Sequence, residues 1–248
     1  MLIFNQKRII TIFLMVFVSL FAFSFKIANN NMLNKEITTE TVALPVTNRV
    51  IVIPASGKTI IIDAGHGTPD EGAESNNGVT EAEINLRIAL KLQNLLEQSG
   101  AKVILTRSNE TAIYDIDKKT LREKKVSDIH NRVKIGNESS ADIFVSIHLN
   151  KIPQNQYWGW QCFYNQNEKS KILAENLQNN LNEAIQKENK RIAMKLDTVY
   201  IMKNVEIPIS IVECGFLSNE EEEKRLQEDD YQNRLAWGIY NGIMDYFN

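Results

Sequence analysis

The sequence predicts an α/β fold: a single domain with a mainly parallel, twisted sheet and helices on both of its faces. Short β-branched runs alternate with longer segments of helical periodicity throughout residues 58–248. The strand-like runs are almost wholly apolar, as expected for strands buried on both faces of a parallel sheet. The chain has 248 residues, of which 43% are hydrophobic and 24% charged, so it is long enough for one sizeable core and too apolar to be disordered.

A basic and then apolar N-terminus predicts export. Lys7 and Arg8 precede an almost unbroken apolar run, Ile9–Phe25, which is typical of a secretory signal peptide or a short N-terminal membrane anchor over residues 1–25. Both interpretations stay open because Ala22 and Ser24 offer only an imperfect cleavage pair. Either one places the rest of the chain outside the cytoplasm. A buried core helix is the structural alternative, and a run of phenylalanines without a polar face disfavours it.

The first elements after the N-terminal segment follow from local signals. Residues 26–57 are rich in Asn and Thr and are expected to be a linker with at most one edge strand, Arg49–Ile53. Thr59–Asp63 is a β-branched run before a glycine-rich turn, which predicts a buried strand. Thr80 and Glu83 form an S/T-x-x-E capping box that opens a helix, and Gly100 stands where that helix should end.

The remaining elements alternate in the same way. The expected order is a strand at Lys102–Thr106, a polar Lys-rich stretch at Asp115–Ser127, a helix at about His130–Asn137, and strands at Ile143–Ile147 and Gly159–Tyr164. A helix follows, with one apolar side made of Ile172, Leu173, Leu177, Leu181 and Ile185. Strands at Val199–Met202 and Ile207–Val212, a solvated helix start at Glu220–Lys224 and a closing helix at Tyr231–Phe247 complete the domain.

Chemically capable side chains stand at the ends of these predicted strands. His66 lies three residues past the strand Thr59–Asp63, His148 directly follows Ile143–Ile147, and Glu213 directly follows Ile207–Val212. Glu81 stands in the first turn of the helix that Thr80 opens. In open α/β sheets the functional site lies beyond the carboxyl ends of the strands, so we expect these side chains to meet.

Two histidines and a carboxylate at one point are a zinc-ligand set with a fourth position open for water. His66, Glu81 and His148 are the candidate ligands, and Glu213 is the natural acid/base that would accept the proton of the water and return it to a leaving amine. Each residue alone also has an ordinary explanation, as a hydrogen-bonded loop histidine or as an acid favoured by the helix dipole. The four residues together therefore indicate a metal hydrolase only weakly.

Other chemistries have less support in the sequence. There is no Walker A motif and no G-x-S-x-G elbow, and the dinucleotide fingerprint that Gly65 would open fails at Asp70. A net charge of −3 argues against nucleic-acid binding. Trp158 and Trp160 would either stack on a sugar or, as we expect, pack in the core or at the sheet edge. Cys162 and Cys214 would either pair or, as we expect, stay unpaired and buried.

Four segments in order resemble one known family. They are Ile61–Gly67, Glu81–Leu86, Ser146–Asn150 and Val212–Asn219, and with their surroundings the chain over Lys58–Asn248 is similar to the zinc-dependent N-acetylmuramoyl-L-alanine amidases. The resemblance implies that His66, Glu81 and His148 bind one Zn²⁺ ion and that Glu213 is the catalytic acid/base. It also implies hydrolysis of the amide between N-acetylmuramic acid and L-alanine in peptidoglycan, with residues 58–248 as the catalytic domain.

Within the family the chain looks most like the germination-specific amidases of spore-forming bacteria, on the segments Asp115–Ser127, Ser146–Ile152 and Val199–Val205. This implies spore cortex peptidoglycan as substrate, a contribution to muramic-δ-lactam formation together with a deacetylase, and a location in the forespore intermembrane space. No wall-binding repeats flank the domain, so we expect targeting through the N-terminal segment, the substrate or a protein partner. Membrane contact is expected only through the N-terminal segment. The alternative is a partner-dependent or regulatory peptidoglycan-binding protein with little activity alone.

Overall fold

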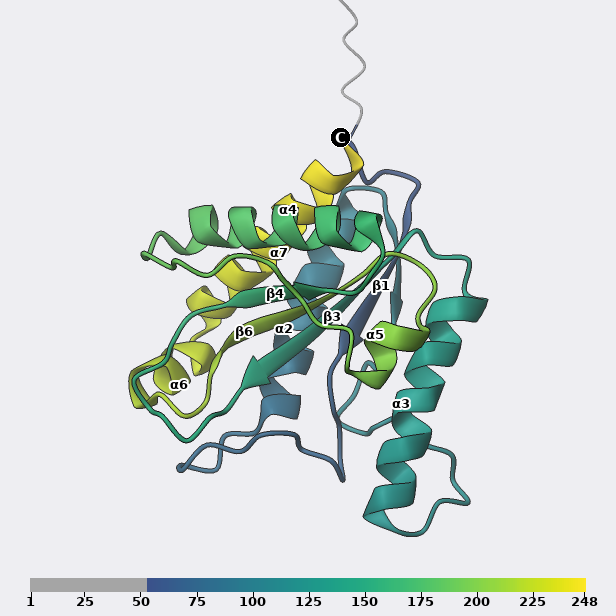
Figure 1. The fold of residues 1–248 in the computed structure, drawn as a ribbon, viewed down its shortest axis with the longest axis vertical. Helices are drawn as coiled ribbons and strands as arrows, with labels where there is room; N and C mark the ends of the chain where they lie inside the picture. Colours follow the sequence, from purple (N-terminus) through teal and green to yellow (C-terminus); the bar gives the residue numbers. More distant parts are fainter. Residues whose placement is uncertain (1–52) are drawn as a thin grey trace, which may run out of the picture. The chain divides into compact units, whose positions relative to one another are not determined.

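A six-stranded sheet with helices on both faces forms the domain, which confirms the predicted fold class (Figure 1). The computed structural model describes residues 53–248. The strands are β1 (Thr59–Ala64), β2 (Lys102–Leu105), β3 (Ile143–Asn150), β4 (Gln161–Tyr164), β5 (Met194–Lys195) and β6 (Ile209–Phe216). The helices are α2 (Glu81–Gln98), α3 (Leu121–Glu138), α4 (Glu168–Ile185), α5 (Tyr200–Asn204), α6 (Glu220–Gln227) and α7 (Asp229–Phe247).

The predicted N-terminal export segment, and all of the predicted edge strand Arg49–Ile53 except Ile53, lie outside the described residues. Within residues 53–248, no helix is both long enough and apolar enough to cross a membrane.

Parallel pairing brings three strand ends to one edge of the sheet. The strand order is β2-β1-β3-β6-β4-β5, and the first four strands in this order, β2, β1, β3 and β6, run parallel to one another. β4 runs antiparallel to β6, and the two-residue β5 pairs with the outer edge of β4, parallel to it. The carboxyl ends of β1, β3 and β6 are therefore adjacent, and they carry the segments in which His66, His148 and Glu213 stand.

Two apolar layers hold the sheet from both sides. In β1, Ile60 and Ile62 face the layer that α2, α4 and α7 cover, and Ile61 faces the layer near α3 and α5. All three side chains are fully buried. A strand with both faces buried needs apolar residues at successive positions, which explains why this run has no polar alternation.

The first helix begins after Thr80 as predicted, but its cap differs from the prediction, and so does the start of α3. Thr80 accepts a hydrogen bond from the backbone of Glu83 at 3.4 Å, but the Glu83 side chain pairs with Arg87, so only half of the expected capping box forms. A complete box forms at Thr120 and Glu123, inside the polar, Lys-rich stretch that was expected to precede the helix. Because this box caps α3, the helix begins at Leu121 rather than near His130.

Other corrections concern short segments. The predicted strand Val199–Met202 is wrong: these residues open the helix α5, which buries Ile201 and Met202, and a four-residue apolar run carries too little periodicity to separate the two states. β3 and β6 run on to Asn150 and Phe216, so His148 and Glu213 lie within strands rather than after them. The helix start at Glu220 is observed, but Glu222 and Glu223 are buried rather than solvated.

Candidate metal centre and active site

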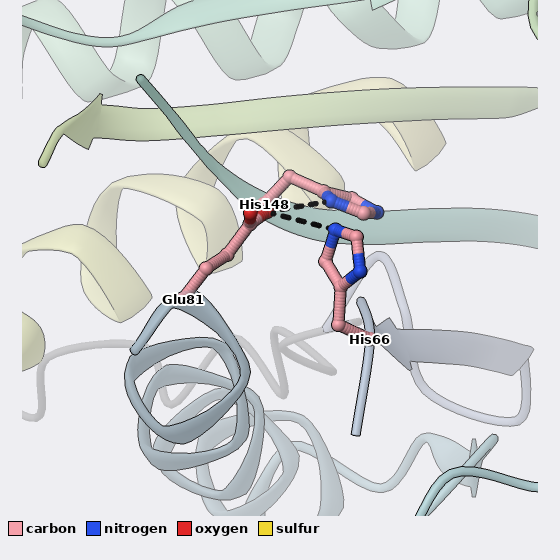
Figure 2. Close-up of side chains that lie close together, drawn as sticks. All are labelled: His66, Glu81 and His148. Atoms are coloured by element: carbon pink, nitrogen blue, oxygen red, sulfur yellow. Dashed lines mark hydrogen bonds and ion pairs between the residues drawn. The ribbon is translucent and has the colours of Figure 1, made fainter. Parts of the chain in front are cut away.

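Three of the four predicted site residues meet at the carboxyl edge of the sheet (Figure 2). His66 stands in the loop after β1, Glu81 is the first residue of α2, and His148 lies near the end of β3. One ligand atom from each lies within 4.8 Å of the other two. Glu81 is central: its Oε1 is 2.9 Å from Nδ1 of His148 and 3.4 Å from Nε2 of His66.

The donor set fits a zinc ion. Zinc holds nitrogen and oxygen ligands at about 2.0–2.1 Å in a tetrahedron, so two ligand atoms lie about 3.3 Å apart. The two separations that involve Glu81, 2.9 and 3.4 Å, lie on either side of this value. Two imidazoles and one carboxylate are also a common protein contribution to a catalytic zinc site. The residues present could therefore hold the metal that the fold family implies.

Backbone groups and a buried amide fix the orientation of the Glu81 carboxylate. The backbone N–H of Leu149 donates to Oε1 at 3.0 Å, and that of Ala73 donates to Oε2 at 2.8 Å. Asn85, one turn later on α2, donates to Oε1 at 3.5 Å and to the carbonyl of Gly65 at 3.2 Å. The carboxylate is thus bonded to β3, to α2 and to the loop that follows β1, so it cannot turn away.

The loop that carries His66 approaches the other side chains so closely that it needs glycine. A Cβ on Gly65 would fall inside the imidazole of His148, and a Cβ on Gly72, whose φ is +70°, would lie 2.6 Å from both Glu81 Oε2 and the ring of His66. His66 itself has a φ of +62°, a conformation that is unfavourable for a residue with a Cβ. The glycine-rich turn seen in the sequence is therefore a packing requirement of the site.

The electrostatics of the three side chains favour positive charge at their meeting point. Burial works against a charged His66, yet hydrogen bonds to Asp70 and Glu81 outweigh it and raise the pKa of His66 to about 9. Burial also opposes ionisation of Glu81, but its hydrogen bonds to His148 and His66 hold the pKa of this carboxyl well below its usual range. The carboxylates of Asp70 and Glu81 thus favour a positive charge on His66, and the ionised Glu81 would likewise stabilise a metal cation placed between the three side chains.

Glu213 lies beside this cluster, but its carboxyl is less well paired than that of Glu81 and its pKa is raised rather than lowered. In the parallel register of β3 and β6 it is the direct partner of His148. Its Oε2 is buried and has no hydrogen-bond partner. Burial, helped by the nearby Glu81 charge and opposed by His148 and His66, raises the pKa of Glu213 to about 7. A carboxyl with such a pKa can take up and release a proton near neutral pH, which is what general acid/base chemistry requires.

A cavity of about 290 Å³ opens at this point. His66, His148 and Glu213 contribute to its polar side. Its apolar side comes from the α3–α5 layer and β6 and consists of Ile129, Leu196, Val199, Ile201 and Ile211. The volume is slightly below the usual range for ligand pockets, so a large substrate would insert only the part that reacts.

The sequence analysis missed the carboxylate that orients His66. Asp70 accepts a hydrogen bond from Nδ1 of His66 at 3.2 Å, which leaves Nε2 to face Glu81, and Lys125 of α3 pairs with Asp70 at 2.8 Å. Such a partner fixes the ring and its tautomer in metal sites. The only sign of this contact in the sequence is that a carboxylate stands four residues after His66. In a loop, unlike in a helix, a spacing of four does not bring two side chains together.

Two alternatives left open by the sequence have structural answers. Trp160 is fully buried and packs in the core, and Trp158 is partly buried with Lys187 over its ring at 3.8 Å. Cys162 and Cys214 are buried free thiols. Burial raises the pKa of both thiols, so neither is an activated nucleophile.

The fold and the clustered side chains define an enzyme of the α/β class whose site lies at the carboxyl edge of a mainly parallel sheet. The pattern that defines the N-acetylmuramoyl-L-alanine amidases matches residues 60–245 of the chain. The chain therefore belongs to the N-acetylmuramoyl-L-alanine amidase family, as the resemblance implied. It is an enzyme of this activity and acts on peptidoglycan, which confirms the predicted reaction class.

Individual relatives agree with this assignment. A germination-specific N-acetylmuramoyl-L-alanine amidase of Bacillus subtilis (strain 168) is 37% identical over 190 residues, which are 75% of this chain and 78% of the relative. The structure of the CwlD amidase from Clostridioides difficile in complex with the GerS lipoprotein has a TM-score of 0.74 and 44% identity and covers 76% of this chain and 98% of that one. An amidase from Clostridium difficile 630 has a TM-score of 0.67 and 30% identity, over 77% and 97%.

Proposed function

We propose that the chain is a zinc-dependent amidase of spore cortex peptidoglycan, in which His66, Glu81 and His148 hold the metal and Glu213 is the acid/base. The observation that carries this proposal is the convergence of the three side chains beside a carboxyl whose pKa lies near 7. The cut would remove stem peptides from muramic acid and so supply the substrate from which a deacetylase begins muramic-δ-lactam formation.

Each residue has a defined task in this reaction. Zinc bound here would polarise the scissile carbonyl and lower the pKa of a water molecule. Glu213, which lines the cavity, accepts the proton of the attacking water and passes it to the amine of L-alanine as the C–N bond breaks. Asp70 holds His66 in the tautomer whose Nε2 faces Glu81, and the apolar side of the cavity limits the access of bulk water.

The cortex assignment and the location are part of the same proposal. The similarity to a germination-specific amidase over 75% of the chain supports the cortex as the substrate. We propose that residues 1–25 are a signal peptide or membrane anchor, residues 26–57 a linker, and residues 58–248 the catalytic domain, which acts in the forespore intermembrane space.

The test is product analysis with and without metal. Purified protein is incubated with cortex peptidoglycan and, in parallel, with vegetative wall, and the products are identified by mass spectrometry. The expected products are peptides with a free N-terminal alanine, more abundant from cortex, whose release stops after chelation and resumes with added Zn²⁺. Equal cleavage by metal-free protein would refute zinc dependence, and fragments of the stem peptide cut at an internal bond would show a peptidase instead.

A second candidate is an enzyme that has little activity until a protein partner binds. It is favoured by the solved structure of the CwlD amidase in complex with the GerS lipoprotein, which is 44% identical to this chain. The two candidates differ in the isolated protein. Full zinc content and turnover without any partner would exclude the second, whereas low values that rise on co-expression with exported spore lipoproteins would favour it.

A further inference from the structure

Two buried arginines bind the backbone of the loop that carries His66. Arg107 donates from Nε to the carbonyl of Ala64 at 2.9 Å and from Nη2 to that of Gly65 at 3.1 Å. Arg132 donates from Nη2 to the carbonyl of His66 at 2.6 Å. Three successive carbonyl oxygens at the end of β1 therefore accept hydrogen bonds from guanidinium groups.

Arg107 also reaches the helix that carries Glu81. The same Nη2 that binds Gly65 donates to the carbonyl of Ala82 at 2.7 Å, and Nη1 donates to that of Asn109 at 2.8 Å. Gly65 directly precedes His66, and Ala82 directly follows Glu81. One rigid planar group thus connects the backbone beside two of the three clustered side chains.

The charge of Arg107 has no acidic partner. Arg132 pairs with Asp63 and Asp128, but among residues 53–248 no carboxylate lies within ion-pair distance of Arg107. Its side chain is nevertheless buried, with 4% of the residue exposed. Burial and the nearby Arg132 lower the pKa of Arg107 to about 10, so it remains a cation at neutral pH. The charges of Asp63, Asp128 and Glu71 offset only part of the cost of burying this cation. A buried cation with no carboxylate in direct contact is an expensive way to stabilise a fold, which points to a local task.

We infer that Arg107 is a positioning residue of the metal centre: it fixes the separation and orientation of His66 and Glu81 before the metal binds. The inference rests on the proposed zinc site. It helps to account for the retention of His66 at a φ of +62°, because Arg107 holds the carbonyls of Ala64 and Gly65, directly before it, while Arg132 holds that of His66 itself. It also requires arginine in particular, since the four carbonyls are met by a planar fork that a lysine ammonium cannot reproduce.

The test compares Arg107→Lys, which keeps the charge and loses the fork, with Gln178→Ala. Gln178 is equally buried, binds the backbone of Cys162 in β4, and contacts none of the three clustered side chains, so it reports a general loss of stability. Zinc affinity is measured by competition with a chromogenic chelator at a temperature where urea unfolding shows both variants to be folded. The absorption spectrum of the Co²⁺-substituted protein reports ligand geometry.

Arg107→Lys should weaken zinc binding by about 10–100-fold, the effect typical of residues that orient metal ligands, and should alter the Co²⁺ spectrum. Gln178→Ala should lower the urea midpoint with zinc affinity and spectrum unchanged. Wild-type zinc affinity and spectrum in folded Arg107→Lys would overturn the inference. Wild-type protein that binds no more metal than His66→Ala would instead refute the proposed zinc site, so the two failures are distinguishable.

A measurement on the wild-type protein covers the case in which Arg107→Lys does not fold. In the metal-free protein, hydrogen exchange of the Arg107 Nε–H is followed by NMR beside that of Arg87, whose guanidinium is exposed. A clamp that exists before the metal binds predicts exchange at least about tenfold slower at Arg107. Exchange as fast as that of Arg87 would overturn the inference.

Discussion

Two groups of buried charges lie side by side at the end of β1, and they are paired to different degrees. The paired cluster consists of Asp63, Asp128 and Arg132. Arg132 contacts both carboxylates, and Asp63 also accepts hydrogen bonds from Thr106 at 2.7 Å and from Ser146. Burial opposes the ionisation of Asp63, but the Arg132 charge and these hydrogen bonds hold its pKa below the usual range.

The site cluster consists of His66, Glu81, His148 and Glu213, and its pairing is incomplete. Glu213 has a buried oxygen without a hydrogen-bond partner, and with a pKa of about 7 the carboxyl exists in both its protonated and its charged form at neutral pH. Buried groups whose bonds are all made stabilise one structure, whereas a buried group left without a partner is available for chemistry. The degree of pairing therefore separates the residues that support the structure of the site from those that take part in its chemistry.

The largest effect is expected at the unpaired member. Glu213→Gln keeps the size of the side chain but cannot exchange a proton, so turnover should fall by about 10²–10⁴-fold while bound zinc stays at the wild-type level. Peptide release from peptidoglycan and metal analysis measure the two quantities. The control is Glu223→Gln, a buried carboxylate that binds Ser75 and Asn77 and should keep most of its activity. If Glu213→Gln turned over at the wild-type rate, Glu213 would not be the acid/base of the reaction.

The paired cluster should respond in stability instead. Arg132→Met leaves Asp63 buried without its counter-ion, and the free energy of unfolding should fall by about 3–5 kcal/mol in urea titrations of the metal-free protein. The control, Arg225→Met, removes an exposed ion pair with Glu221 and should change the free energy of unfolding by less than about 1 kcal/mol. A loss for Arg132→Met as small as that control would break the comparison, because the paired cluster would then contribute little to the fold.

The same division explains what the sequence could predict. Strands β1, β3 and β6 are almost continuous apolar runs, and helices α2, α4 and α7 have helical periodicity. Their order and the meeting of His66, Glu81 and His148 at the carboxyl edge of the sheet therefore followed from simple rules. Periodicity fails where a segment is short, as at α5, or polar, as at the start of α3.

The supporting residues could not be predicted because their partners are distant in sequence. Apart from the carbonyl of Asn109, the backbone carbonyls that Arg107 and Arg132 bind lie 25 to 68 positions away. A carbonyl is present at every residue, so no residue pattern marks the contact. Asp70 is close to His66 along the chain, but only the folded loop turns its carboxylate toward the ring.

A smaller effect should appear in the pH dependence of stability and would sharpen the comparison. The pKa of Glu213 is about 7 in the folded metal-free protein against an ordinary value of 4.5, so the folded state binds a proton that the unfolded state has lost between these values. A raised pKa contributes stability below pH 4.5 that is lost as the pH rises through 7. Relative to Glu213→Gln, metal-free wild-type protein should therefore lose up to about 3 kcal/mol between pH 4.5 and pH 8, since one pKa unit corresponds to about 1.4 kcal/mol.

The difference between the two proteins isolates Glu213, because His66, whose pKa is also raised, titrates in both. Urea unfolding at several pH values, with chelator present, measures it. Added zinc should reduce the difference, since a cation beside Glu213 favours its charged form. A wild-type curve parallel to that of the variant would mean that Glu213 finds a partner in solution, and it would then belong with the paired cluster rather than with the site.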